Sequence, residues 1–84
     1  MTESTTDWQL QATKRLDVRP ILAEGGEPFA LILETAAPLK TGETLLLIAP
    51  FEPVPLYQVL FERGFSHETR FMGAGEWWVL FTRA

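Results

Sequence analysis

Apolar positions recur along the chain with two different periods, and each period predicts one kind of element. Residues 14–19 (KRLDVR) and 65–72 (FSHETRFM) alternate between apolar and polar side chains, whereas 43–49 (ETLLLIA) contains a continuous apolar run. Alternation is typical of a strand with one buried face, and a continuous run is typical of a central strand buried on both faces. Residues 76–83 (EWWVLFTR) complete four predicted strands, and a glycine-rich turn at 73–75 joins the last two.

Two segments between these strands carry the helical period. The first predicted helix opens at Pro28 and ends before Pro38, because proline is tolerated in the first turn of a helix but not in its interior. Its apolar side chains fall on one face at the spacing i, i+3, i+4, i+7: Phe29, Ile32, Leu33 and Ala36. The second predicted helix covers 54–63 and stops at Gly64. We expect 20–26 to form a loop.

This order of elements, β-α-β-α-β-β, predicts the fold class α+β. Right-handed crossovers place both helices on one face of the sheet, and the closing hairpin makes the last strand antiparallel to its predecessor. The expected architecture is a two-layer α/β sandwich with a four-stranded mixed sheet. A chain of 84 residues is too short for two cores, so we expect one domain over 14–84. Residues 1–13 are expected to be an N-terminal tail, or else to pack on the sheet through Trp8 and Leu10.

The two faces of the predicted sheet differ in what covers them. Between sheet and helices we expect a core of Leu16, Val18, Phe29, Ile32, Leu33, Leu56, Val59, Leu60, Trp77, Val79 and Phe81. The face without helices also receives apolar side chains: Leu46, Ile48, Trp78 and Leu80. An exposed apolar strip usually marks an interaction site. We therefore expect a protein partner or a second copy of the chain on this face, and the N-terminal tail is the alternative cover.

Charge excludes two classes of partner. Seven Lys and Arg against eleven Asp and Glu give a formal net charge of −4. The basic residues are scattered along the chain, whereas nucleic-acid and anionic-membrane surfaces need clustered cations. We therefore expect no nucleic acid and no membrane as partner. The sequence has no apolar run of about 20 residues that could span a bilayer. The polar, acidic N-terminus is not a signal peptide, so we expect a cytoplasmic protein.

The residue types that are missing limit the chemistry further. The chain has no cysteine and a single histidine, His67. Thiolate chemistry, disulfides and cysteine-ligated metals are excluded, and we predict no cofactor, no metal and no catalytic residue. Ser66 and His67 point to opposite faces of a strand, so they form no dyad. We interpret His67 as a partly buried structural residue, and Asp17 with Arg19 as a solvated ion pair.

One edge of the sheet is the best candidate for a ligand site. In open α/β sheets, ligands bind beyond the carboxyl ends of the parallel strands. The loops at 19–28 and 50–55 meet at this edge, where both helix N-termini could hold an anion. The ligand-binding candidates are Arg19, Glu24, Gly25, Glu27 and Glu52. Three carboxylates could instead suit a hard cation, or simply cap the helices.

Several segments resemble a known bacterial family: LDVRP, GGEPF, TGETLLLI and APFEPVPLYQVLFERGF. The family is catalogued as domain of unknown function twenty-two forty-nine, and the resemblance runs from Leu16 to Arg83. This family is related to the TusA/SirA sulfur carriers, and the resemblance implies their fold, with strand order 1-2-4-3. The carriers hold a Cys-Pro-x-Pro motif at the first helix. The matching stretch here is Gly25-Gly26-Glu27-Pro28, which offers no nucleophile and cannot carry a persulfide.

Two functions follow from these observations. The favoured one is a non-enzymatic protein-binding or adaptor module, on a sulfur-carrier-like fold that cannot carry sulfur. The alternative is a small-molecule or metal-binding domain at the loop edge. Members of the family occur fused to haemerythrin-like domains and near denitrification functions, which implies a link to redox or nitrogen-oxide metabolism for that alternative.

Overall fold

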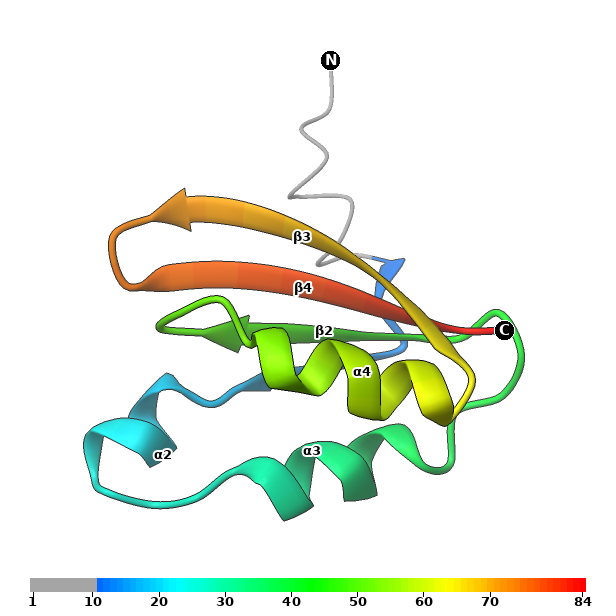
Figure 1. The fold of residues 1–84 in the computed structure, drawn as a ribbon, viewed down its shortest axis with the longest axis horizontal. Helices are drawn as coiled ribbons and strands as arrows, with labels where there is room; N and C mark the ends of the chain where they lie inside the picture. Colours follow the sequence, from blue (N-terminus) through cyan, green and yellow to red (C-terminus); the bar gives the residue numbers. More distant parts are fainter. Residues whose placement is uncertain (1–10) are drawn as a thin grey trace.

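The computed structural model describes residues 11–84, which form a four-stranded sheet with helices on one side (Figure 1). The elements are β1 (Lys14–Asp17), α2 (Arg19–Ala23), α3 (Phe29–Ala36), β2 (Thr44–Ala49), α4 (Val54–Glu62), β3 (Phe65–Gly73) and β4 (Glu76–Arg83). The predicted α+β class and two-layer arrangement are confirmed, with one short helix added. No helix in the stretch from residue 11 to residue 84 is both long enough and apolar enough to cross a bilayer.

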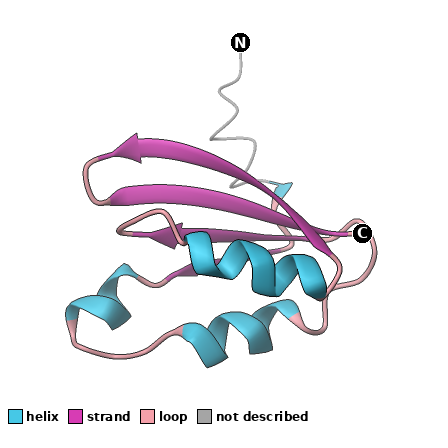
Figure 2. Ribbon diagram, viewed as in Figure 1, coloured by secondary structure: helices cyan, strands magenta, loops and turns pink. Residues whose placement is uncertain are grey.

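The strand order is β1-β2-β4-β3, as expected, and it makes β2 and β4 the central strands (Figure 2). β1 runs parallel to β2, and β4 is antiparallel to both of its neighbours. Leu47 on β2 pairs with Leu16 on one side and with Val79 on the other. Directly paired side chains share a face, so this register places all three on the helix side of the sheet.

The expectation of a loop over 20–26 is wrong for residues 20–23, because α2 begins one residue after the end of β1, and it holds for residues 24–26. Proline is favoured in a first helical turn, and Pro20 occupies that place. The Leu22 amide donates to the Val18 carbonyl at 3.1 Å. Ile21 and Leu22 pack against the core. A helix of five residues is too short to show a period in the sequence, and its start explains why β1 ends at Asp17 rather than at residue 19.

The helix side of the sheet carries the main core. Its fully buried members include Ile32 on α3, Leu60 on α4, and Leu47, Val79 and Phe81 in the sheet. Every residue of the run Leu45–Ala49 is buried, as expected for a central strand.

Five residues expected in this core are less buried than predicted. Leu16, Leu33, Val59 and Trp77 are only half-buried. Phe29 is 38% exposed, because it is the first residue of α3 and lies at the rim of a pocket rather than beneath the helix. Helical spacing identifies the face of a side chain, but not whether the end of that face is covered.

The helix-free face carries the expected apolar strip, and the centre of this strip is buried, whereas the polar side chains at its rim, such as Arg15 and Glu68, are exposed. Leu46, Ile48 and Trp78 form a second apolar cluster, and Trp78 is only 7% exposed. Ala12 packs against this cluster from the N-terminal side. Trp8 and Leu10, the cover considered above, lie outside the described residues. The strip is therefore closed within one chain rather than open to solvent.

Candidate functional site

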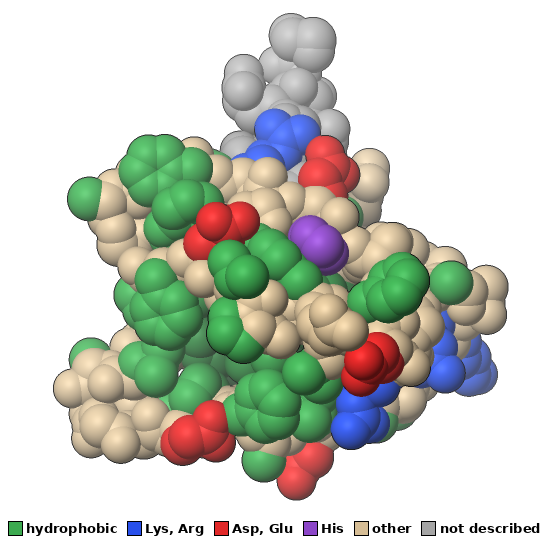
Figure 3. Space-filling view, viewed as in Figure 1, with side chains coloured by type: hydrophobic (Ala, Val, Ile, Leu, Met, Phe, Trp, Pro, Cys, Tyr) green, Lys and Arg blue, Asp and Glu red, His purple; other side chains and the backbone are tan. Residues whose placement is uncertain are grey.

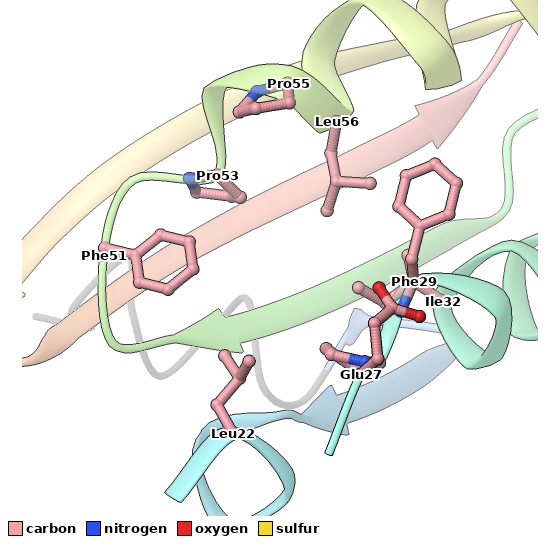
Figure 4. Close-up of a pocket in the computed structure, with 9 residues that line it drawn as sticks. Leu22, Glu27, Phe29, Ile32, Phe51, Pro53, Pro55 and Leu56 are labelled. Carbon is pink, nitrogen blue, oxygen red and sulfur yellow. The ribbon is translucent and has the colours of Figure 1, made fainter. Parts of the chain in front are cut away.

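An open apolar pocket lies at the loop edge of the sheet, with a volume of about 220 Å³. Figure 4 shows apolar side chains around this space from three helices and from the loop that follows β2. They are Leu22 from α2, Phe29 and Ile32 from α3, Phe51 from the loop, and Pro53 and Leu56 at the start of α4. This edge is where the sequence predicts a ligand site, although most of these residues were not among its candidates.

Prolines shape the loop on one side of the pocket. β2 ends before Pro50, and α4 begins after Pro53 with Pro55 in its first turn. Proline fixes its own φ and has no backbone N–H, so it suits a helix start but not the continuation of a strand. Phe51 stands between these breaks with 53% of its surface exposed. An aromatic residue in such a loop has no strand or helix face to bury it.

Glu27 lines the pocket and caps the helix behind it. Its Oε2 accepts a hydrogen bond from the Phe29 amide at 3.0 Å, at the start of α3. A carboxylate there satisfies a free N–H group and interacts favourably with the helix dipole. The capping interpretation is thus confirmed for Glu27. Because the carboxylate already occupies this helix start, an added anion would meet a negative charge.

Glu52 supports Tyr57 instead of capping a helix with its side chain. The Tyr57 hydroxyl donates to Glu52 Oε2 at 3.0 Å and lies 2.5 Å from Thr69 Oγ1. The tyrosine ring stacks on His67, with ring centroids 3.8 Å apart and planes 6° apart. Burial, opposed by the Thr69 hydrogen bond and reinforced by Glu52, raises the pKa of Tyr57 above its usual value.

His67 lies on the predicted face but is more exposed than expected. It pairs directly with Phe81, which places it on the helix side of the sheet. However, β3 is an edge strand, and the ring of Tyr57 stacks on this side chain without enclosing it. The expectation of a partly buried histidine is therefore wrong, since His67 falls among the exposed residues.

Arg19 is held away from the pocket. Its Nε and Nη2 donate to the two carboxylate oxygens of Asp17 at 3.0 and 2.8 Å, and its Nη1 lies 3.4 Å from Glu76 Oε1. The predicted ion pair is confirmed and is extended by Glu76. The hydrogen bond from the Arg19 side chain lowers the pKa of Asp17. Asp17 pairs with Ile48, so this cluster belongs to the helix-free side of the sheet.

Glu24 and Gly25 form the turn after α2. Gly25 has φ +82°, a conformation that glycine adopts at little cost. The next glycine is needed for space, since a Cβ on Gly26 would lie 2.8 Å from Ile21 Cγ2. Gly25 and Gly26 thus serve a tight turn between α2 and α3. Glu24 is exposed at its start.

The five predicted ligand residues therefore do not form one site, because Arg19, Glu27 and Glu52 each contact a different part of the chain. Of the five residues only Glu27 lines the pocket. Within the described range 11–84, no three Asp, Glu or His side chains come together as ligands for a metal ion. The pocket residues missed in the sequence carry one usable signal, which is the apolar Phe51 between loop prolines. Neither periodicity nor charge could identify the others.

The structure of one chain does not test the predicted interface. Leu46, Ile48 and Trp78 are buried within the chain, and Leu80 is half-buried against them. A partner on this face would therefore meet less apolar surface than the strand pattern predicts.

The fold and the pocket together define a small α+β domain with an open apolar pocket at the loop edge of its sheet. The sequence matches a family model described as "Uncharacterized conserved protein (DUF2249)" over residues 15–83, and the chain belongs to this family. The match covers the four strands apart from Lys14 at the start of β1, so the family and the fold describe the same unit. No curated protein and no solved structure matches the sequence.

Proposed function

We propose that this protein is a non-enzymatic binding module that takes up an apolar side chain of a partner protein in the loop-edge pocket. The observation that carries this proposal is the open apolar pocket with Phe29 and Phe51 exposed at its rim. Exposed aromatic residues around a concave apolar site are typical of interaction surfaces, where a few buried anchors supply most of the affinity.

The size of the pocket favours a side chain over a cofactor. Its volume of about 220 Å³ lies below the range of about 300–1,000 Å³ that is usual for drug-sized ligands. The one ionisable side chain among its lining residues is Glu27, which is engaged by the Phe29 amide. No second ionisable side chain stands beside Glu27 in the lining that the described residues form, which supports binding rather than catalysis.

The charge around the pocket indicates the kind of partner segment. Glu24, Glu27 and Glu52 are all exposed in the loops at this edge. Complementary charges steer association and select partners. The segment that fits is therefore an apolar anchor residue flanked by Lys or Arg. The relation to the sulfur carriers and the link to redox or nitrogen-oxide metabolism stay predictions, and this proposal does not depend on them.

A titration followed by NMR tests the proposal with defined probes. The peptides acetyl-Lys-Phe-Lys-amide and acetyl-Lys-Leu-Lys-amide are added to the labelled protein, and acetyl-Lys-Ala-Lys-amide is the control. We expect the Phe and Leu peptides to shift amide signals of the pocket residues, and the Ala peptide to leave them unchanged. Equal shifts with all three peptides would show that only charge is recognised, and would contradict the proposal.

Two matched variants locate the site. Phe51→Ser should weaken binding of the Phe peptide, because it removes part of the pocket wall. Phe61→Ser is the control, since Phe61 is an exposed aromatic on α4 that does not line the pocket. If both variants bind as the unaltered protein does, the pocket is not the binding site.

A further inference from the structure

A second cavity lies at the other end of the helix layer, and its chemistry differs from that of the loop-edge pocket. Its volume is about 320 Å³. It is lined by Leu33, Ala36 and Ala37 of the α3 end, Arg63 after α4, Phe65 of β3 and Arg83 of β4. Figure 3 shows Lys and Arg side chains at the right-hand end of this layer, where α4 ends in Figure 1. We name this cavity, which contains Arg63 and Arg83 in its wall, the two-arginine cavity.

We infer that the two-arginine cavity binds an oxyanion attached to an apolar group, either a carboxylate or a phosphate monoester. Both charged side chains in its wall are guanidinium groups, whose planar N–H donors match the two oxygens of a carboxylate or phosphate. The remaining lining is apolar and includes the buried side chains of Ala36 and Phe65. A ligand with a charged head and an apolar tail satisfies both parts.

Neither arginine is neutralised by the described part of the chain. Arg19 pairs with Asp17 and Glu76, whereas within residues 11–84 no carboxylate forms an ion pair with Arg63 or Arg83. The nearest acidic neighbour in sequence, Glu62, accepts instead from Gln58 at 3.0 Å. Both guanidinium groups are therefore without an ion-pair partner among residues 11–84, although the net charge of the chain is −4.

The fold holds Arg83 in place before any ligand binds. Arg83 pairs with Phe65 across the β3–β4 ladder, and its Cζ lies 5.3 Å from the centre of the Phe65 ring. Phe65 is itself buried, so the guanidinium rests on a fixed aromatic surface. A donor that is already positioned loses less side-chain entropy when an anion binds.

The helix ends do not cancel this positive charge. α3 and α4 both end at the cavity, and each helix C-terminus carries about half a negative charge. Two such ends offset about one of the two guanidinium charges. The helix ends therefore offset only part of the charge of the two guanidinium groups, and the remaining positive charge favours an anion over a neutral ligand of the same shape.

Calorimetry and NMR with four probes measure separately how much the charged head group and the apolar tail of the ligand contribute to binding. Sodium hexanoate and hexyl phosphate carry both features, inorganic phosphate lacks the tail, and hexanol lacks the charge. We expect hexanoate or hexyl phosphate to bind at least about tenfold more tightly than hexanol and inorganic phosphate, with weaker binding as salt increases. Comparison of the two amphiphilic probes decides between carboxylate and phosphate. If hexanol binds as tightly as hexanoate and hexyl phosphate do, the inference is overturned.

Variants test whether the arginines are responsible. Arg63→Gln should weaken binding of the better probe about tenfold, and Arg63→Lys should restore part of it. Arg15→Gln is the control, because Arg15 is an exposed arginine of β1 that does not line the cavity. Arg63 is exposed, so its variants should fold, and Phe51→Ser should bind this probe normally. Equal binding by Arg63→Gln and Arg15→Gln would overturn the inference without affecting the proposed function.

Discussion

The hydroxyl of Tyr57 lies 3.0 Å from Glu52 Oε2 and 2.5 Å from Thr69 Oγ1, and the Tyr57 ring stacks on the exposed side chain of His67. At the residue scale, such contacts shift the pKa of an individual side chain, and for Tyr57 the pKa is raised. Asp17 shows the opposite direction of shift, because its carboxylate is held by the Arg19 guanidinium. Both shifts have a direction that can be measured in solution.

The titration of Tyr57 should be visible without interference, because it is the single tyrosine of the chain. Since burial raises its pKa above the usual 10.0, absorbance near the tyrosinate band should rise at higher pH in the folded than in the unfolded protein. The associated stabilisation is complete below pH 10.0 and is lost as pH rises through the raised pKa. Glu52→Gln should move the midpoint down, whereas Glu24→Gln should not. A folded-state midpoint at or below the unfolded one would contradict this assignment.

Asp17→Asn should lower stability at neutral pH by at most about 1 kcal/mol, because the ion pair is partly exposed. The pKa of Asp17 is lowered in the folded state, so its stabilisation is present above the ordinary value of 3.8 and is lost as pH falls through the lowered pKa. Urea unfolding of both proteins should therefore give different midpoints at neutral pH and converging midpoints in acid. A difference that persists in strong acid would have another cause.

At the element scale, α3 shows how one helix divides between core and solvent. Ile32 and Ala36 face the sheet and are buried, while Leu31 and Phe29 are exposed. The period of the apolar residues predicts the buried face, but Phe29 at the helix start belongs to the pocket rim. The short helix α2 follows another rule, since Pro20 and the contacts of Ile21 and Leu22 with the core determine it rather than any period.

Neighbouring leucine and isoleucine positions on α3 make a matched test of this division. Ile32 is 2% exposed, so Ile32→Ala should cost about 2–5 kcal/mol through lost burial and the cavity left behind. Leu31 is 40% exposed, and Leu31→Ala should cost less than about 1 kcal/mol. Denaturant unfolding of both variants checks the difference. Similar losses for the two would mean that the orientation of α3 is different.

At the scale of the whole molecule, the sheet carries a buried apolar cluster on each of its faces. Helices cover one face, and the cluster of Leu46, Ile48 and Trp78 is closed on the other, with Ala12 against it. The Trp78 indole also donates to Glu76 Oε2 at 2.7 Å. Through Glu76, this hydrogen bond connects the apolar cluster of the helix-free face to the ion pair of Arg19 and Asp17.

Trp78→Ala should therefore destabilise a single chain by about 3–5 kcal/mol, as removal of a buried aromatic residue does. Phe71→Ala is the control, since Phe71 is an aromatic residue of the same sheet with an exposed side chain. Thermal unfolding at several protein concentrations measures both. The partner or homodimer predicted for this face stays a prediction, and light scattering tests it. A Trp78→Ala protein that loses association but keeps its stability would support an interface over an intramolecular core.

Local patterns in the sequence determined which elements form and in what order. Alternation, helical spacing and the places of proline and glycine act over a few residues, so they predict β1 through β4, α3 and α4 before any contact is known. The ion pair of Asp17 and Arg19 is local in the same sense, because the two residues are only two positions apart, although Arg19 begins α2 instead of continuing the strand.

The tertiary structure decided what each face covers and which side chains meet. Phe51 and Leu22 are far apart in sequence and line one pocket; Arg63 and Arg83 line another. The burial of Trp78 and the withdrawal of Arg19 from the loop edge likewise depend on register and on neighbouring segments. The physical reason is that burial and charge pairing depend on distances through space, which a local pattern does not contain.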